Sequence, residues 1–238
     1  MRRSGRVEGG RRMAELADEI EVAYPQQPHC ATVLLLDTSG SMSGAKITGL
    51  NDGLRLFLRE TGADPLASKR VDLAVVTFGG EISLQHAFAP VTEYAADLTL
   101  TAQGSTPMGR ALERGLEMLE TRKATYRQQG TDYYRPWLFL ITDGDPTDMH
   151  PGDDRWNALT QRLREGVAAR RFAFFAVGVE GANLERLRQL CPPDRPPLAL
   201  KGLAFAELFQ WLSRSQRQVS ASHTGEQVQL PTVDWGTV

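Results

Sequence analysis

Three oxygen-bearing side chains lie at alternate positions just after an apolar run in this chain of 238 residues. Residues 33–36 are Val, Leu, Leu and Leu, and Asp37, Ser39 and Ser41 follow them. Such a run favours a strand buried on both faces, and the ligand sites of these sheets lie beyond the carboxyl ends of the strands. Carboxylate and hydroxyl oxygens are ligands that suit Mg²⁺. The spacing therefore predicts a divalent-metal site, because alternate residues of a tight loop can turn toward one point.

Two further positions could complete the ligand set of the metal. Thr106 comes just before a predicted helix and offers a third hydroxyl, and Asp143 follows an apolar strand and offers a second carboxylate. Two acids balance one divalent ion, and neutral hydroxyls leave that ion able to accept an acidic oxygen from outside. We therefore expect Asp37, Ser39, Ser41, Thr106 and Asp143 to hold Mg²⁺, or Mn²⁺ in its place.

The elements that must position these residues alternate between strands and helices. Apolar runs predict strands, and apolar residues at three- and four-residue spacings predict helices. Residues 82–88 are expected to form a hairpin with the strand before them and to lie antiparallel at one sheet edge. The order predicts an α/β, doubly wound fold, with a mostly parallel central sheet, one antiparallel edge strand and helices on both faces. The other strands are expected at 33–36, 71–78, 137–142, 172–179 and 198–200. Helices are expected at 46–60, 155–170, 184–190 and 205–212, and a further helix starts within the turn at 103–108 and reaches about 123.

A family resemblance supports this interpretation. The sequence Asp-Thr-Ser-Gly-Ser at 37–41, with Thr106 and Asp143, resembles the metal-ion-dependent adhesion site (MIDAS) of von Willebrand factor type A (VWA) domains, which have a Rossmann-like fold. The resemblance covers residues 29–220 and implies an N-terminal extension at 1–28 and a C-terminal tail at 221–238. More narrowly, segments at 142–148, 176–179 and 208–213 look like the TerY group of bacterial tellurium-resistance and stress proteins. That resemblance implies a protein kinase or a PP2C-type phosphatase as candidate partners.

The composition and the distribution of apolar residues indicate which classes of partner and which cellular location to expect. A formal net charge of −2 provides no broad basic field, so nucleic acid is not an expected partner. Neither a signal-like apolar segment nor a long apolar span is present, which predicts a cytoplasmic protein without a membrane contact. Met13 could be the biological start in place of Met1. Cys30 and Cys191 are isolated in the sequence and are typical of reduced, structural cysteines.

Several residues near the predicted site have a simpler explanation than metal binding. By itself, the loop at 37–41 is typical of a helix cap with a turn, since Asp and Ser are favoured there. Asp145 and Asp148 could add a negative field, but Asp-Pro-Thr-Asp is also ordinary turn chemistry. His86 and His150 are isolated, and we do not expect either to bind the metal.

Two other classes of function stay open. A metal-dependent phosphoryl-transfer enzyme could use Asp37 as its nucleophile, although such an enzyme would want a second acid in place of Ser39. The glycines and the lysine at 40–46 do not have the spacing of a phosphate-binding loop, and Met42 stands between Gly40 and Gly44 where a nucleophile elbow needs serine. A structural scaffold could instead use its two tails and keep only a vestigial site. We expect a non-enzymatic module whose metal binds the acidic side chain, Glu or Asp, of a protein partner.

Overall fold

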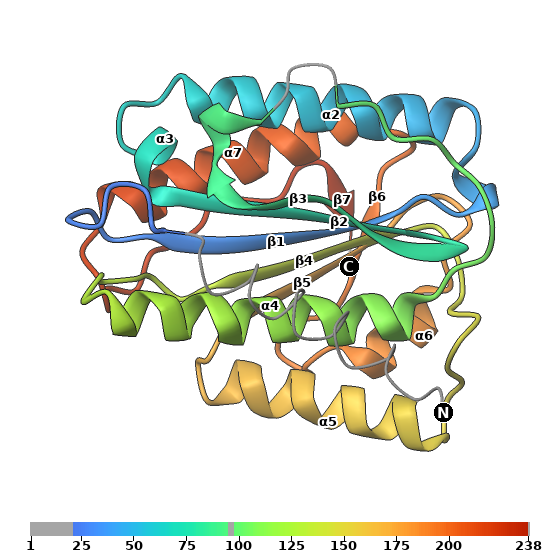
Figure 1. Ribbon diagram of the computed structural model, residues 1–238. Coiled ribbons are helices and arrows are strands. Elements are labelled where there is room, and N and C mark those ends of the chain that lie inside the picture. Colours follow the sequence, from blue (N-terminus) through green and yellow to red (C-terminus); the bar gives the residue numbers. More distant parts are fainter. Residues whose placement is uncertain (1–20, 95–97, 238) are drawn as a thin grey trace, which may run out of the picture.

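A computed structural model describes residues 21–94 and 98–237 of the chain. They form a seven-stranded sheet in the order β3-β2-β1-β4-β5-β6-β7, with helices packed on both faces (Figure 1). The predicted doubly wound α/β fold is therefore confirmed. Most of the predicted N-terminal extension, and with it the choice between Met1 and Met13, lies outside the described residues.

The sheet is parallel at its centre and antiparallel at both edges. Strand β1 pairs in parallel with β2 and β4, and β5 pairs in parallel with β4 and β6. The antiparallel edge strand β3 is confirmed, whereas the short antiparallel strand β7 was not predicted. The strands are β1 (Cys30–Asp37), β2 (Val71–Gly79), β3 (Glu81–Pro90), β4 (Trp137–Thr142), β5 (Ala173–Gly178), β6 (Leu198–Leu200) and β7 (Gly236–Thr237).

The helices form one layer on each face of the sheet (Figure 1). One layer contains α2 (Ala45–Gly62), α3 (Ala67–Arg70) and α7 (Phe205–Ala221). The other contains α4 (Met108–Gln128), α5 (Asp154–Ala168) and α6 (Leu184–Leu190). Two single 3₁₀ turns, η1 (Gly40–Met42) and η2 (Val91–Glu93), follow β1 and β3.

Strand β1 is buried along its whole length because both of its faces are covered. Leu34 and Leu36 belong to the core beneath α2 and α7, and Val33 and Leu35 belong to the core beneath α4. Burial on both faces explains why the strand is a continuous apolar run rather than an alternating one. The strand delivers Asp37 to the carboxyl edge of the sheet.

The strand order reverses between β1 and β4. From β1 the chain continues to α2 on one face, and from β4 it continues to α5 on the other. Leu36 pairs with Ile141, so the carboxyl ends of the two strands are level. Such a reversal leaves a crevice outside the strand ends, where α/β proteins bind ligands. The loops that carry Asp37 and Asp143 therefore meet at this point.

The residues that follow α7 pack back onto the domain. The ring of Trp235 is 1% exposed and lies 5.7 Å from the ring of Trp211, centre to centre. The indole nitrogen of Trp211 donates a hydrogen bond to the carbonyl oxygen of Pro231 at 2.8 Å. The part of the predicted C-terminal tail that the structure describes thus extends the core beside β6.

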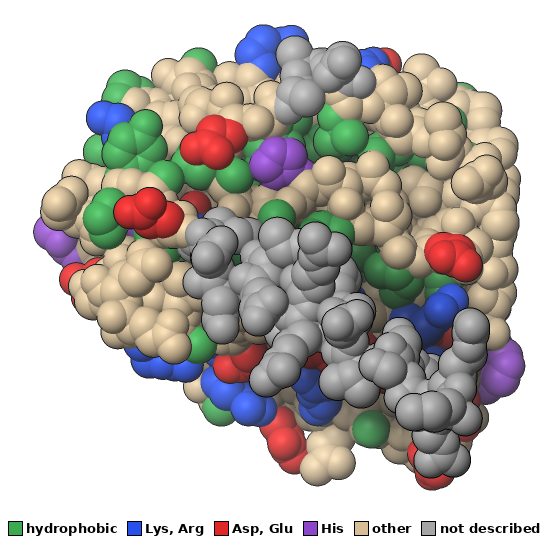
Figure 2. Space-filling view, viewed as in Figure 1, with side chains coloured by type: hydrophobic (Ala, Val, Ile, Leu, Met, Phe, Trp, Pro, Cys, Tyr) green, Lys and Arg blue, Asp and Glu red, His purple; other side chains and the backbone are tan. Residues whose placement is uncertain are grey.

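Both cysteines are free and buried. Burial raises the pKa of the Cys30 thiol to about 12, and burial likewise raises the pKa of Cys191 to about 12. Thiols with such pKa values are poor nucleophiles at neutral pH, which agrees with a structural role. On the outside, Figure 2 shows charged side chains of both signs interspersed over the face viewed in Figure 1.

Candidate metal site

Three loops converge at the carboxyl ends of β1 and β4. They are the loop after β1, the loop before α4 and the loop after β4, and backbone hydrogen bonds join them. Gly40 N donates to Gly104 O at 2.9 Å, and Thr147 N donates to Thr106 O at 2.9 Å. Gly104 has a φ of +73°, and a Cβ there would lie 2.6 Å from the Cα of Gly80, so glycine suits both its conformation and its space. The frame of the site is therefore fixed by main-chain contacts.

Asp37 is fully buried, and each of its carboxylate oxygens has a hydrogen-bond donor. Ser39 N donates to Oδ1 at 2.8 Å, and Thr142 Oγ1 donates to Oδ2 at 2.5 Å. Burial raises the pKa of Asp37, the hydrogen bonds oppose that rise, and the nearby Asp143 adds to it. A cation beside Asp37 would compensate for this buried negative charge.

A chain of hydrogen bonds joins three of the predicted ligands. Ser39 Oγ and Ser41 Oγ lie 3.0 Å apart, and Ser41 Oγ donates to Asp143 Oδ1 at 2.6 Å. Asp143 is 3% exposed. Oxygens from two loops that are about 100 residues apart in sequence thus form one cluster next to Asp37.

Thr106 lies beside the same cluster, next to Gly144. A Cβ placed on Gly144 would lie 3.4 Å from Thr106 Oγ1 and 3.8 Å from Ser41 Oγ. Both hydroxyls therefore lie within contact distance of the same point beside Gly144. The structure brings together all five residues that the sequence predicts as ligands.

Lys46 belongs to this cluster, although the sequence analysis did not identify it. Its Nζ donates to Asp143 Oδ2 at 2.6 Å and to the carbonyl oxygen of Ser41 at 3.4 Å. Lys46 lies in the first turn of α2, where the helix dipole disfavours a cation. A lysine in this unfavourable position indicates a nearby acidic partner, and the sequence shows that position once the helix is predicted.

The two acids that follow Asp143 have partners of their own. Asp145 Oδ2 forms an ion pair with Arg186 Nη1 at 2.7 Å. The carboxylate of Asp148 accepts hydrogen bonds from the backbone nitrogens of Gly109 and Arg110, both at 2.9 Å. Asp148 therefore holds the first turn of α4 and so positions Thr106 just before it.

The two isolated histidines also have local contacts. The ring of His86 stacks on Tyr94 with 3.9 Å between ring centres, on the edge strand β3. His150 is exposed, and its backbone nitrogen donates to Asp153 Oδ2 at 2.6 Å. Neither contact involves the cluster around Asp37.

The donor set suits a small, hard cation. Two carboxylates and three hydroxyls offer only oxygen ligands, which Mg²⁺ and Mn²⁺ accept. In the parts of the chain that the structure describes, no three His, Cys, Asp or Glu side chains converge as a possible metal site. Any cation held here would therefore depend on the hydroxyls of Ser39, Ser41 and Thr106 as well as on the two acids.

Comparison with known protein families assigns the fold to one of them. The sequence model of the von Willebrand factor type A domain matches residues 32–207, a stretch that includes all five clustered residues. The chain belongs to the VWA domain family. VWA domains generally mediate protein interactions, often in a metal-dependent way.

A curated relative of the chain is a much longer protein. The chain is 28% identical over 191 residues to inter-alpha-trypsin inhibitor heavy chain H4 of Sus scrofa. The match covers 76% of this chain and 19% of the relative. The chain thus spans about a fifth of the length of that curated protein.

Solved structures of other VWA-like proteins share the fold at low sequence identity. The pilus adhesin SpaC from Lactobacillus rhamnosus GG has a TM-score of 0.62 and 14% identity, over 81% of this chain and 31% of its own. The manganese-loaded TRAP protein of Plasmodium vivax has a TM-score of 0.51 and 22% identity, over 78% of this chain and 74% of its own. Among the described helices of the VWA chain, none combines the length and apolar character needed to cross a membrane.

Proposed function

We propose that this VWA domain binds an acidic side chain of a partner protein through a divalent cation. Mg²⁺ or Mn²⁺ would be held by Asp37, Ser39, Ser41, Thr106 and Asp143. The observation that carries the proposal is the hydrogen-bonded chain from Ser39 through Ser41 to Asp143, beside the buried carboxylate of Asp37. Neutral hydroxyls leave the ion with positive charge that attracts one more acidic oxygen.

The surroundings of Asp37 favour binding over catalysis. A phosphoryl-transfer enzyme would need Asp37 to attack a substrate, but this side chain is fully buried and its two oxygens accept hydrogen bonds from Ser39 and Thr142. Each oxygen keeps a lone pair that can face an ion or its bound water. A buried, fixed carboxylate suits that role better than nucleophilic attack, so we propose a non-enzymatic module.

Two structural relatives support the elements of this proposal by analogy. The TRAP protein was solved with manganese, which agrees with a divalent cation as the ligand of this fold. SpaC is a pilus adhesin, which agrees with a role in binding. Because both are less than 25% identical to the chain, the choice of ligands rests on the contacts of Asp37 and Asp143.

We propose a cellular setting on the basis of the finer resemblance to the TerY group. The segments at 142–148, 176–179 and 208–213 support membership of that tellurium-resistance and stress-response group. On this basis we propose a cytoplasmic protein whose acidic partner is a protein kinase or a PP2C-type phosphatase. Growth of a deletion strain on tellurite, with and without the intact gene, tests this setting separately from the metal chemistry.

Partner capture with and without a chelator tests the proposed function. We expect the immobilised protein to retain a partner from native cells in Mg²⁺ and to release that partner in EDTA. Asp37→Ala removes a carboxylate from the site and should abolish retention. Asp52→Ala removes an exposed carboxylate on α2 and should have no effect. Retention that is indifferent to EDTA, or unchanged in Asp37→Ala, would contradict the proposal.

A further inference from the structure

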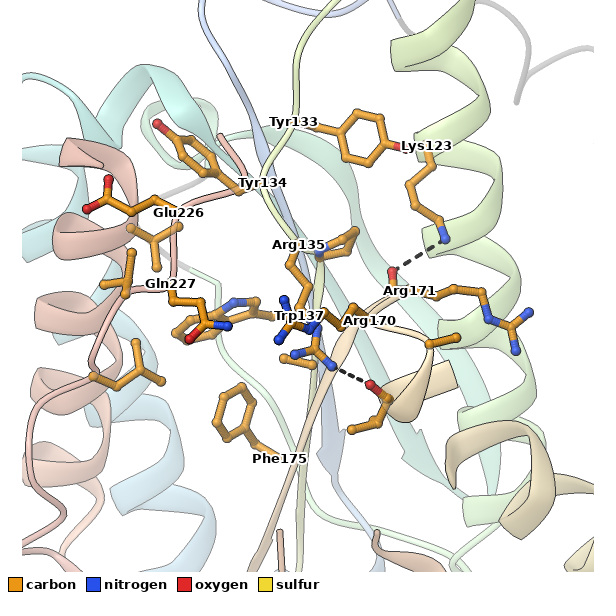
Figure 3. Close-up of a pocket in the computed structure, with 18 of the residues that line it drawn as sticks. Lys123, Tyr133, Tyr134, Arg135, Trp137, Arg170, Arg171, Phe175, Glu226 and Gln227 are labelled. Carbon is orange, nitrogen blue, oxygen red and sulfur yellow. Dashed lines mark hydrogen bonds between the residues drawn. The ribbon is translucent and has the colours of Figure 1, made fainter. Parts of the chain in front are cut away.

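A large cavity lies at the amino-terminal ends of the parallel strands, whereas the candidate metal site lies at their carboxyl ends. Its volume is about 930 Å³, and it is lined by the first residues of β4 and β5, by the end of α5 and by the segment that follows α7. Figure 3 shows side chains from these elements pointing into the same space. Small-molecule sites commonly have volumes of roughly 300–1,000 Å³, so this cavity is large enough for one.

The cavity is basic although the chain as a whole is slightly acidic. Six of its lining side chains are basic and three are acidic, an excess of three positive charges, whereas the whole chain has a net charge of −2. Lys123 is already paired with Glu120, at 2.7 Å. The basic residues are Lys123, Arg127, Arg135, Arg170, Arg171 and Arg195, and the acidic ones are Glu120, Asp194 and Glu226.

Three arginines carry most of this excess charge. Arg135 Nη2 donates to the carbonyl oxygen of Val167 at 2.8 Å, while its Nε is buried without a hydrogen-bond partner among the described residues. The guanidinium carbon of Arg195 lies 5.4 Å from the ring centre of Phe175, which holds this side chain over the cavity wall. Arg135 and Arg170 lie near Trp137 in Figure 3, whereas Arg171 points away from them.

Arg170 and Arg195 are close enough to Arg135 for their charges to repel it. Burial lowers the pKa of Arg135, and the charges of Arg195 and Arg170 lower it further, with only Asp194 acting in the opposite direction. Positive charges that are held together in a partly enclosed space gain from an anion between them. A dianion would offset this repulsion better than a single carboxylate.

We propose that this cavity binds the phosphate group of a small-molecule phosphate monoester. The planar fork of a guanidinium matches two phosphate oxygens at once. The apolar side chains of Phe175, Val228 and Leu230 line the same cavity and would contact the body of the ester. The size of the cavity favours a small molecule over a protein segment.

Calorimetric titration of the full chain with phenyl phosphate tests this proposal. We expect one binding site whose affinity falls about tenfold in Arg135→Gln and in Arg195→Gln, because each loses charge-assisted hydrogen bonds. Arg162→Gln removes an exposed arginine of α5 that does not line the cavity, and it should bind phenyl phosphate as the parent does. Titration in EDTA should give the same affinity, because the candidate metal site lies at the opposite ends of the strands.

Further arms of the experiment separate the proposal from its alternatives. Arg135→Lys keeps the charge but loses the fork, so we expect an intermediate affinity, and thermal melting checks that each variant is folded. Three results would overturn the proposal: no binding of phenyl phosphate, equal binding by all variants, or equal binding of benzoate. A phosphoserine peptide that binds where phenyl phosphate does not would assign the cavity to a protein partner and would also overturn it.

Discussion

The two carboxylate oxygens of Asp143 have different partners. Oδ1 accepts the hydrogen bond from Ser41, and Oδ2 accepts the one from Lys46. The same acid thus belongs both to the proposed ligand cluster and to an ion pair whose lysine is only 22% exposed. A divalent ion at the proposed site would compete with the ammonium group of Lys46 for Asp143. We therefore expect the lysine to weaken metal binding and to compensate the two acids in the metal-free protein.

Replacement of Lys46 by methionine should tighten metal binding. Lys46→Met keeps an unbranched side chain that is one atom shorter and removes the positive charge from Asp143. We expect the affinity for Mn²⁺ to rise about tenfold or more, since a positive charge within a few ångströms of the ion opposes binding. Calorimetric titration with Mn²⁺ measures this change.

The matched control is Lys69→Met, which removes an exposed lysine that lies over the ring of Tyr24. This variant should bind Mn²⁺ as the parent does. In the absence of metal, Lys46→Met should be the less stable of the two, because Asp37 and Asp143 then repel each other without a nearby cation. Weaker Mn²⁺ binding in Lys46→Met would show that the lysine supports the ion rather than competing with it.

Helix α4 is joined to strand β2 by a buried polar cluster around Asp72. Arg122 donates to Asp72 Oδ2 from Nε at 2.9 Å and from Nη2 at 2.6 Å, and Tyr126 Oη donates to the same oxygen at 2.5 Å. On the other side, His29 Nδ1 lies 3.4 Å from Asp72 Oδ1. The cluster fixes the helix that begins next to Thr106, so it supports the candidate site from a distance.

Loss of the Asp72 charge should destabilise the fold strongly. Asp72→Asn removes the negative charge from a buried ion pair with Arg122, and breaking such a pair typically costs about 3–5 kcal/mol. Urea denaturation at pH 7 measures the loss. Asp52→Asn breaks an exposed pair with Arg55 and should change stability by no more than about 1 kcal/mol. Similar losses in the two variants would contradict a structural role for the cluster.

The same cluster predicts part of the acid sensitivity of the protein. Burial by itself would raise the pKa of Asp72, but His29, Arg122 and Tyr126 hold this pKa below its ordinary value of 3.8. Because the pKa is lower in the folded state, the stabilisation is present above about pH 4 and is lost as the pH falls through the folded pKa. Between pH 7 and pH 3, the parent should therefore lose more unfolding free energy than Asp72→Asn. Parallel losses would refute this linkage.

Helices α2 and α7 pack closely at a glycine. A Cβ on Gly53 would lie 2.9 Å from Phe209 Cε2 and 3.1 Å from the backbone oxygen of Phe205, which cannot turn aside. Gly53→Ala should therefore cost about 1–3 kcal/mol through overpacking, despite the better helix propensity of alanine. In Gly62→Ala the nearest atom, Thr92 Cγ2, lies 3.7 Å away, so stability should be unchanged or higher. Thermal melting of Gly53→Ala and Gly62→Ala measures both changes in stability.

The sequence predicts best the strands and helices that have a strong apolar pattern. Strands β1 and β4 are continuous apolar runs, and their ends place Asp37 and Asp143 correctly because parallel strands end at one edge. Strand β7 and the burial of Trp235 were not predicted, since they depend on tertiary contacts with β6 and α7. The pairing of Lys46 with Asp143 was missed for the same reason: the two residues are 97 positions apart and meet only in the fold.

The two proposed binding sites lie at opposite ends of the parallel strands of one sheet. The candidate metal site lies beyond the carboxyl ends of β1 and β4, and the basic cavity lies at the first residues of β4 and β5 (Figures 1 and 3). Between them, the two hydrophobic cores consist mainly of strand and helix side chains and include none of the five proposed ligands. The fold should therefore persist without metal, and the two sites should bind their ligands independently.

Metal should add to the stability of this preformed fold. A ligand that binds only the native state at about 100 times its dissociation constant stabilises a protein by about 2.7 kcal/mol. We expect Mn²⁺ at that ratio to raise the melting temperature of the parent and to leave that of Asp37→Ala unchanged. Unfolding of the parent on addition of EDTA would contradict a core that is independent of the ion.

The most direct measurement is a calorimetric titration of Mn²⁺ into the metal-free protein, with Asp37→Ala and Asp52→Ala beside it. The parent and Asp52→Ala should each bind one ion with the same affinity, because Asp52 lies exposed on α2. Asp37→Ala should bind none at this site, since it lacks one of the two carboxylates that balance the charge of the ion. Binding of Mn²⁺ by Asp37→Ala with the affinity of the parent would contradict the proposed metal site.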